Sequence, residues 1–510
     1  MSTDPKLYKG TFILIGLALL NILIHLLCYN NLEYHRDELL YFTLGLHPAL
    51  GYATVPPLIG WVAFVMQSLF GFTLFSVKLF PALLSGVFLY VTAGITRELG
   101  GKLPAQILTA IAILVMPLNL RAFYLFQPVC IDLFLWTYLL YLVIRYINTS
   151  QDKYLLIFGV VLGFAFLNKY LIALLLITLL LALASTGHFD IFRKRKFYYA
   201  AGLTLLIFLP NLIWQVMNGL PVIDHMRELN ENQLVNVDRV QFLIDQLMSP
   251  FAASLLTIPG LLFLLFNKKY RFVGVTAALV ILILCLLRGK SYYTVGVIPA
   301  LIAAGGVFFE KYVRNKLAFW SLPILMILIT VPVIPFGIPV YKAERLVKYF
   351  HTLEVKYGLI LGRTFEDGSI HSLPQDYADQ LGWEELTMLT SRAYDQVTDK
   401  DRCLIYCENY GQAGALAVIG KKYGLPEPVS FHESFYYWKP LSFDPDIETL
   451  IYINDELGED VEKLFADITI VGKISNPHAR EYGTTVYLCR APRSSFNALW
   501  KDVLKRIEEE

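Results

Sequence analysis

A cluster of ionisable residues follows the first apolar stretch of the chain, in the loop 30–56. Its central part reads RDELLY from Arg36 to Tyr41. A carboxylate beside an acceptor hydroxyl removes its proton as a general base, so Asp37 and Glu38 are candidate catalytic residues. The alternative is a solvated loop in which an acidic side chain caps the start of a helix.

A second cluster is cationic and interrupts the apolar segments. Lys169 lies within the apolar stretch 154–186, where a lysine is costly in lipid and normally faces a partner inside a helix bundle. Cations at such positions suit a phosphate, which requires charge-assisted hydrogen-bond donors. The alternatives are a helix-hairpin turn for Lys169 and loop side chains that extend to lipid phosphates. The candidate phosphate-binding residues are Lys169, Arg288, Lys290, Tyr292 and Tyr293.

Two other regions carry isolated polar residues. Asp132 is a candidate cavity residue, although an acid at a helix start is also favoured by the helix dipole. The loop 218–240 contains His225 and Arg227, and Arg227 is a further candidate for the phosphate. Glu38 and His225 are the candidate metal ligands, but a single histidine is more often structural, and no zinc-type cysteine cluster accompanies it.

These cations and carboxylates fit a phosphate-bearing lipid substrate that reaches the outer leaflet. Cations stabilise the charge that develops on such a phosphate when its bond breaks. The carboxylate takes the proton of the acceptor hydroxyl. No cofactor is required when lysine and arginine supply the positive charge, and whether a divalent metal takes part is left open. The sequence contains neither a P-loop nor a G-x-G-x-x-G motif after a strand.

Composition indicates a membrane protein. The chain has 510 residues, of which 56% are hydrophobic and 17% charged, against about 25% charged in an ordinary soluble domain. The mean hydropathy is +0.53. So few charges cannot cover the surface of a soluble protein, so we expect lipid to surround most of the chain. A net charge of +1 argues against a nucleic-acid partner.

The charges are distributed unevenly along the chain. Residues 341–510 hold 19 basic and 28 acidic residues, whereas residues 1–340 hold 24 and 14. This difference predicts a transmembrane domain over 1–340, which includes the acidic outer loop 30–56, and a soluble domain over 341–510. The expected fold is a polytopic α-helical membrane protein with a C-terminal α/β domain.

The apolar runs predict about 11 transmembrane helices. They lie near 11–29, 75–97, 104–120, 128–147, 154–167, 169–186, 198–217, 250–266, 272–287, 293–309 and 317–337. The stretch 57–71 is too short to span comfortably, and we expect a juxtamembrane helix at the outer surface. The basic loops then place the N-terminus in the cytoplasm and the C-terminal domain in the periplasm of a bacterial inner membrane.

The C-terminal region alternates strand and helix patterns. Strands are expected at 403–407, 449–453, 468–472 and 484–488, with helices near 374–396, 411–424 and 459–466. The segment 406–411 suits either a ligand loop or a strand-to-helix turn, and the turn is favoured. We find no catalytic set in this region and hypothesise that it covers the active site or helps to select the acceptor.

Four features of the sequence resemble family 39 of the GT-C glycosyltransferases, which includes protein O-mannosyltransferases and lipid A aminoarabinose transferases. The likeness covers about residues 10–310. Its features are the acidic loop with its following prolines, the acid Asp132 after Gln127-Pro128, the turn Gly163–Lys169, and Lys290–Tyr293 with Pro299 beyond.

This resemblance implies an inverting transferase that uses a polyprenyl-phosphate sugar. Asp37 would be the general base or position the acceptor, and Lys169 with Tyr292 or Tyr293 would contact the donor phosphate. Arg36 and Tyr41 would line the cavity, and His225 and Arg227 match an outer-loop histidine and arginine. Val55 departs from the basic residue that aminoarabinose transferases carry, which weakens the assignment to lipid A.

The implied partners are a polyprenyl-phosphate-linked sugar donor, an acceptor that is a lipid, glycan or protein, and the membrane lipids. One alternative is a transporter or flippase for a lipid-linked or anionic substrate. Such a protein would use polar residues at the midplane and internal repeats, and no clear repeat is present. A receptor that presents the C-terminal domain would leave the carboxylates and loop cations unexplained.

Overall fold

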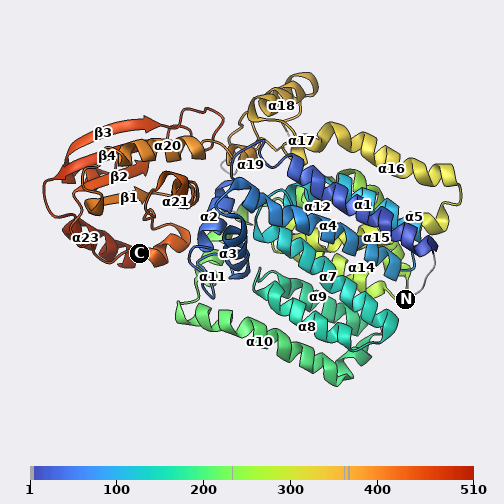
Figure 1. Ribbon diagram of the computed structural model, residues 1–510. Helices are drawn as coiled ribbons and strands as arrows, with labels where there is room; N and C mark the ends of the chain where they lie inside the picture. The colour runs from blue at the N-terminus through green and yellow to red at the C-terminus, as the bar shows by residue number, and fades with distance from the viewer. Residues whose placement is uncertain (1–4, 233, 361, 366–367, 510) are drawn as a thin grey trace. The chain divides into compact units, whose positions relative to one another are not determined.

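The computed structural model describes residues 5–509 except 233, 361 and 366–367. The chain forms two compact units, which are described separately (Figure 1). The first unit consists of Met1–Tyr29, Ala49–Ile59 and Lys78–Val340. The second consists of Asn30–Pro48, Gly60–Val77 and Tyr341–Glu510.

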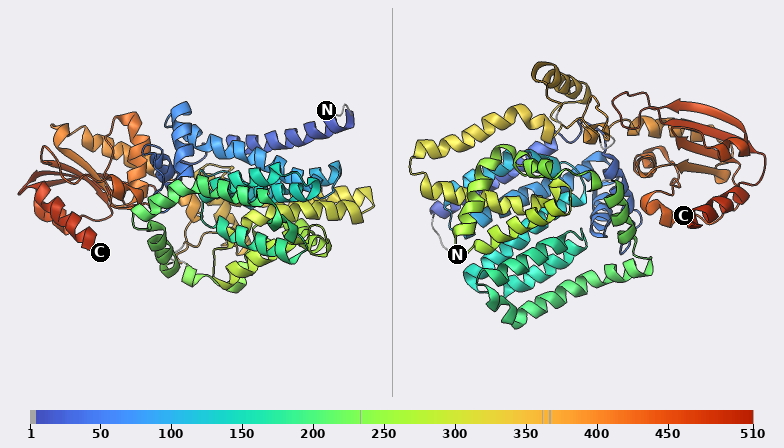
Figure 2. Two further views of the ribbon diagram at one scale, coloured as in Figure 1. Left: turned by 90° about the horizontal axis from the view of Figure 1, so that it is seen from below. Right: turned by 180° about the vertical axis from the view of Figure 1, so that it is seen from behind.

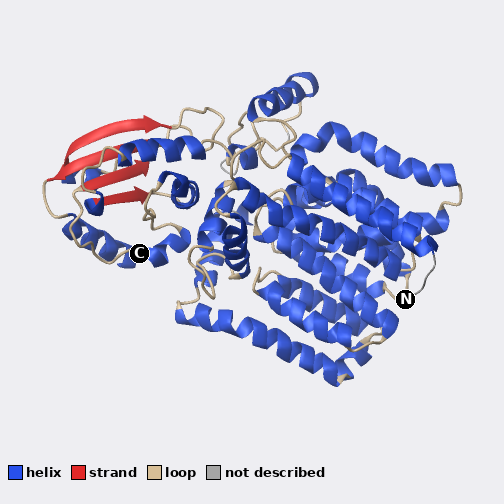
Figure 3. Cartoon of the chain, viewed as in Figure 1, coloured by secondary structure: helices blue, strands red, loops and turns tan. Residues whose placement is uncertain are grey.

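The described part of the first unit contains helices and connecting loops but no strand (Figure 3). Its α-helices are α1 (Pro5–Leu27), α4 (Leu74–Glu98), α5 (Leu103–Val115), α6 (Pro117–Ala122), α7 (Pro128–Thr149), α8 (Lys153–Phe166), α9 (Ile172–Ser185), α10 (Arg195–Met217), α11 (Pro221–Asn232), α12 (Arg239–Met248), α13 (Ser254–Phe266), α14 (Arg271–Leu286), α15 (Ile298–Tyr312), α16 (Lys316–Thr330) and α17 (Ile334–Gly337). Short 3-10 helices join them, of which η4 (Ser291–Val297) leads into α15.

The length and hydropathy of these helices are those of a multi-pass membrane protein. Among the described residues, six segments are long and apolar enough to cross a membrane. A seventh is obtained if α12 and the helical segment Phe251–Phe266, which meet at an angle of 86°, form one span. Five further apolar helices, one of them α3 (Leu58–Phe70), have 10–17 residues. The total of about 11 spans therefore stays a prediction.

One expected apolar run is divided in the structure. The sequence predicts a continuous segment over 104–120, but α5 ends at Val115 and α6 begins at Pro117. Proline lacks the N–H that a continuing helix requires and forces the residue before it, Met116, into extended backbone.

Close helix packing in the first unit depends on glycines. Helix α13 packs against α15, and α8 packs against α7 and α10. Figure 1 shows α8 (teal) beside α10 (green). A Cβ added to Gly260 of α13 would lie 1.9 Å from the carbonyl oxygen of Leu301, and one added to Gly305 of α15 would lie 2.1 Å from that of Leu256. Only glycine allows these two helix backbones to approach so closely.

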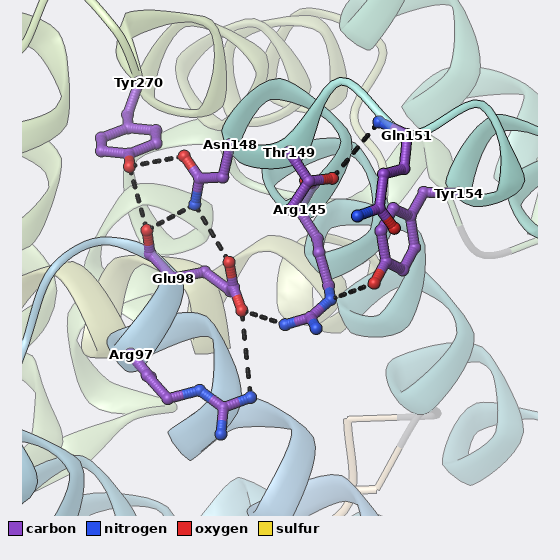
Figure 4. A network of polar contacts seen from close by, with 8 residues as sticks. All are labelled: Arg97, Glu98, Arg145, Asn148, Thr149, Gln151, Tyr154 and Tyr270. Carbon is purple, nitrogen blue, oxygen red and sulfur yellow. Dashed lines mark hydrogen bonds and ion pairs between the residues drawn. The ribbon is translucent and has the colours of Figure 1, made fainter. Parts of the chain in front are cut away.

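A polar network joins the ends of three helices in the first unit (Figure 4). The carboxylate of Glu98, at the end of α4, pairs with Arg145 of α7. The Nε of Arg145 also donates a hydrogen bond of 2.7 Å to the hydroxyl of Tyr154 in α8. Asn148 Nδ2 donates to the Glu98 carbonyl at 2.7 Å, and the Tyr270 hydroxyl donates to the same carbonyl at 2.9 Å. The network satisfies helix-terminal groups that would otherwise remain without partners.

The second unit contains a four-stranded sheet in the order β1-β2-β4-β3 (Figure 3). Strands β1 and β2 are parallel, and β4 is antiparallel to both β2 and β3. All four strands occur where the sequence predicts them. Their bounds are β1 (Cys403–Cys407), β2 (Thr449–Asn454), β3 (Phe465–Lys473) and β4 (Thr485–Pro492).

Helices cover both faces of this sheet, with α20 and α23 on opposite faces (Figures 1 and 2). Phe496 and Trp500 of α23 pack in one hydrophobic cluster with Leu450, Tyr452 and Cys489 of the sheet. The amphipathic pattern of α23 was not recognised in the sequence. The helices of this unit are α2 (Arg36–Leu44), most of α3, α18 (Ala343–Tyr357), α19 (Gln375–Ala378), α20 (Trp383–Tyr394), α21 (Tyr410–Val418), α22 (Glu459–Leu464) and α23 (Phe496–Glu509).

The acidic loop packs with this second unit. The sequence assigns residues 30–56 to the domain 1–340, whereas residues 30–48 form a compact unit with 341–510. Within that unit α2 packs against α21. The candidate general base is therefore positioned by C-terminal residues.

Candidate functional site

Helix α2 begins with a capping box that uses Glu38. His35 is the N-cap, and its Nδ1 accepts a hydrogen bond of 3.1 Å from the backbone N–H of Asp37. The Glu38 carboxylate accepts a hydrogen bond of 2.9 Å from the backbone N–H of His35. Glu38 is fully buried, so this contact accounts for its position, whereas the carboxylate of Asp37 takes no part in the cap.

The loop before α2 is fixed by a C-terminal segment. The Glu33 carboxylate accepts backbone hydrogen bonds from Gly382 at 3.3 Å and Glu384 at 2.9 Å. In the main chain, Glu33 N–H donates to Gln380 and Arg36 N–H donates to Asp379, each at 3.0 Å. These four bonds satisfy backbone groups on both segments and hold the start of α2 in one position.

Tyr410 provides the contact partner of Asp37. The Tyr410 hydroxyl donates a hydrogen bond of 2.8 Å to Asp37 Oδ1. The Arg36 guanidinium carbon lies 4.3 Å from the centroid of the Tyr410 ring, within cation–π range. Burial, followed by the nearby charge of Asp37, raises the pKa of Tyr410 well above its ordinary value, so the phenol remains a hydrogen-bond donor.

Two glycines of α21 allow this contact. A Cβ added to Gly411 would lie 2.8 Å from Arg36 Cγ, and one added to Gly414 would lie 2.9 Å from the carbonyl carbon of Leu39. Larger residues would separate α2 from α21. The glycines therefore set the spacing at which the Tyr410 hydroxyl reaches Asp37.

Potential metal ligands in the described residues form one group of three, His35, Asp376 and Asp379. His35 Nε2 lies 3.7 Å from Asp376 Oδ1 and 3.8 Å from Asp379 Oδ2. The capping bond to His35 Nδ1 requires a lone pair there, which puts the ring proton on Nε2. A protonated nitrogen does not bind a metal, so Nε2 ligation would break the cap. Burial raises the pKa of Asp379, although His35 and Arg480 oppose this shift.

In the first unit Lys169 lies in the turn between α8 and α9. Its ammonium is 4.7 Å from the ring centroid of Tyr293 and 5.4 Å from that of Tyr292. Asn168 Nδ2 donates to the Pro128 carbonyl at 3.0 Å and anchors this turn against α7. Lys169 thus lies in a hairpin turn and is partly buried there beside two aromatic rings.

Lys169 also interacts electrostatically with Asp132 and Lys290. Asp132 Oδ1 accepts a hydrogen bond of 3.0 Å from Trp136 Nε1 within α7. The like charge of Lys290 opposes that of Lys169, whereas the carboxylate of Asp132 favours it.

The remaining candidates in this unit have other contacts. The Arg288 guanidinium donates to the Val235 carbonyl at 2.6 Å, and Arg227 pairs with Asp224 at 3.6 Å. His225 lies in α11 and interacts with Lys290, and burial lowers its pKa.

The candidates of the sequence thus separate between the two units. The first unit holds Asp132, Lys169, His225, Arg227, Arg288, Lys290, Tyr292 and Tyr293, and the second holds Arg36, Asp37, Glu38 and Tyr41. The carboxylate of Glu38, the first of the two candidate metal ligands, accepts the hydrogen bond from the His35 N–H that caps α2. Tyr41 lies in α2 and is partly buried.

Sequence reasoning missed two residues. Tyr410 lies in the segment 406–411, which was interpreted as a strand-to-helix turn, and the aromatic residue at the start of that helix was the available signal. Lys78 of α4 is almost fully buried, and its ammonium lies 4.0 Å from the ring centroid of Tyr124. A lysine inside an apolar run of the sequence was the corresponding signal.

The fold is similar to that of solved ArnT structures, and comparison with known proteins supports the resemblance seen in the sequence. Residues 54–214 match a family model described as dolichyl-phosphate-mannose-protein mannosyltransferase. No curated protein matches the sequence.

Two similar solved structures are both ArnT from Cupriavidus metallidurans. The structure bound to undecaprenyl phosphate has a TM-score of 0.63 and 16% identity, with 94% of this chain and 97% of that chain covered. The apo structure has a TM-score of 0.60 and 14% identity, with 95% and 98% covered. The likeness therefore extends over most of the chain.

Proposed function

We propose that the protein is an inverting glycosyltransferase that moves a sugar from a polyprenyl-phosphate donor to an acceptor hydroxyl. The observation that carries this proposal is Lys169, whose ammonium lies beside the rings of Tyr292 and Tyr293 in a turn of a membrane-protein fold. An anion is the ligand that a cation in such a position favours. The similar ArnT structure that binds undecaprenyl phosphate supports a lipid phosphate as that anion.

The reaction follows from these charges. The bond between sugar C1 and the donor phosphate oxygen breaks, and the phosphate keeps the electron pair. Lys169 and Lys290, with the hydroxyls of Tyr292 and Tyr293, stabilise the added negative charge. The acceptor oxygen bonds to C1 from the opposite face, and Asp37 takes its proton. The charge changes are balanced by protein side chains, so the scheme needs no metal or other cofactor.

The proposed topology follows the basic loops. The N-terminus lies in the cytoplasm, about 11 helices span a bacterial inner membrane, and α3 lies at the outer surface. The C-terminal domain lies in the periplasm, where a lipid-linked donor and a lipid, glycan or protein acceptor are both accessible.

The test is a transfer assay with the full-length protein in lipid nanodiscs. A panel of polyprenyl-phosphate sugars is offered with membrane lipid, glycan and protein fractions, and glycosylated products are detected by mass spectrometry. We expect one donor to yield product with an inverted anomeric configuration, measured by NMR. Asp37→Asn should reduce the rate at least about a hundredfold, because general-base catalysis contributes that much. Substrate flux across vesicles without any product would instead indicate a transporter.

A further inference from the structure

The carboxylate of Asp37 is in an unusual position for a residue in the first turn of a helix. Aspartate there commonly bonds to backbone N–H groups of its own helix. In α2 the ring of His35 and the carboxylate of Glu38 take those roles. The Asp37 carboxylate instead receives the Tyr410 hydroxyl from a helix that begins 373 residues later.

The backbone of Tyr410 is fixed on its N-terminal side. Asn409 caps α21 and forms a reciprocal capping box with Gln412. The Glu481 carboxylate accepts hydrogen bonds from both cap residues, at 3.1 Å from Asn409 Nδ2 and 2.9 Å from Gln412 Nε2. A residue held next to such a doubly anchored cap has little freedom of main-chain movement.

The ring of Tyr410 is held as well. The guanidinium of Arg36 lies over it, and the His432 ring packs against it at 5.1 Å between centroids with an interplanar angle of 66°. Because the ring is already ordered by these neighbours, little side-chain entropy is lost when its hydroxyl bonds to Asp37. The hydroxyl is thus a preorganised donor.

We propose that Tyr410 is a positioning residue for the general base Asp37. Its O–H bond to Oδ1 holds the Asp37 carboxylate in one orientation for removal of the proton from the acceptor hydroxyl. The C-terminal domain thereby contributes directly to the chemistry of the acidic loop, in addition to any role in acceptor selection. This inference rests on the proposed function, because it assigns Tyr410 a role through Asp37.

The test uses Tyr410→Phe, which removes the hydroxyl and keeps the ring beneath Arg36. We expect kcat to fall about tenfold to a hundredfold, with the KM for the donor unchanged, because misorientation of a catalytic group costs rate rather than donor binding. Tyr357→Phe removes a hydroxyl from a 67%-exposed ring of the same unit and should change neither quantity.

A double-mutant cycle tests whether the Tyr410 hydroxyl affects the transfer rate through the carboxylate of Asp37. Asp37→Asn combined with Tyr410→Phe should be no slower than Asp37→Asn alone, because the hydroxyl acts through that carboxylate. A second cycle on the unfolding temperature reports the bond itself without any transfer assay. Both single variants should lower this temperature, and the double variant should lower it by less than their sum.

The possible results separate the two proposals. Wild-type kcat in Tyr410→Phe, with Asp37→Asn inactive, would overturn the role of Tyr410 and leave the proposed function intact. A fall in stability of Tyr410→Phe with unchanged kcat would also overturn it, since the residue would then be structural only. Full activity of Asp37→Asn would remove the base and with it the role of Tyr410. Absence of product with every donor would reject the proposed function, and the stability cycle would still measure the bond.

Discussion

The hydroxyl of Tyr410 lies 2.8 Å from Oδ1 of Asp37, although 373 positions separate the two residues along the chain. The contact joins α21 of the C-terminal domain to the first turn of α2. It distinguishes Asp37 from its neighbour Glu38, whose carboxylate completes the cap of the same helix. Two adjacent acids thus have different partners, and their variants should behave differently.

Glu38 is expected to be structural. Glutamine also accepts the His35 N–H and preserves the capping box, whereas alanine cannot. We therefore expect Glu38→Gln to retain transfer and its unfolding temperature, and Glu38→Ala to lose about 1 kcal/mol of stability. Transfer rate and thermal unfolding are measured on the same preparations. If Glu38→Gln were inactive while folding normally, Glu38 would return as a catalytic candidate.

Lys169 is expected to bind the donor phosphate. Lys169→Gln removes one charge-assisted hydrogen bond, which contributes about 1.5–3 kcal/mol, so the KM for the donor should rise about tenfold to a hundredfold. Initial rates over a range of donor concentrations measure this change. Lys316→Gln is the matched control, because Lys316 is exposed at the start of α16. An equal KM in both variants would contradict the phosphate-binding role.

Gly414 is expected to set the distance between α21 and α2. Gly414→Ala places a methyl group 2.9 Å from Leu39, and such overpacking costs about 1–3 kcal/mol, more than the roughly 1 kcal/mol gained from helix propensity. The unfolding temperature and the transfer rate should both fall. Gly202→Ala in α10 is the control, since a Cβ there meets nothing within 4 Å. Equal unfolding temperatures for both variants would show that α2 adjusts without cost.

Glu427 is expected to make stability depend on pH in the acidic range. The hydrogen bond from His47, at 3.0 Å, lowers the pKa of Glu427 from 4.5 to about 2. Its stabilising contribution is therefore complete above pH 4.5 and is lost as the pH falls through about 2. Because the pair is partly exposed, we expect less than about 1 kcal/mol.

The measurement for Glu427 is thermal unfolding between pH 6 and pH 2, followed by tryptophan fluorescence. Trp438 contributes to this signal, because its ring stacks on His47 at 4.0 Å. The difference between wild type and Glu427→Gln should be present at pH 6 and disappear towards pH 2. Glu456→Gln, at an exposed position, should show no such convergence. A difference that grew on acidification would have the wrong sign for a lowered pKa.

Local patterns were sufficient for much of the fold. The sequence predicts β1 and β2 within one residue of their observed ends, because a short apolar run rich in β-branched and aromatic residues specifies a buried strand locally. Local reasoning failed at Pro117, where a hydropathy average does not register the missing N–H. It also failed for residues 30–48, since the partner that buries a loop is not encoded in the loop itself.

The sequence by itself determined that most of the chain is a membrane protein, where its strands lie, and that Lys169 is a cation within an apolar stretch. These properties depend on composition and on short-range periodicity, both of which are set by residues that are close together in the sequence. Only the tertiary structure decided that Glu38 caps α2, that Tyr410 bonds to Asp37, and that Lys290 interacts with Lys169. Such contacts depend on how distant segments pack, because a hydrogen bond or ion pair requires atoms within a few ångströms, whatever their separation along the chain.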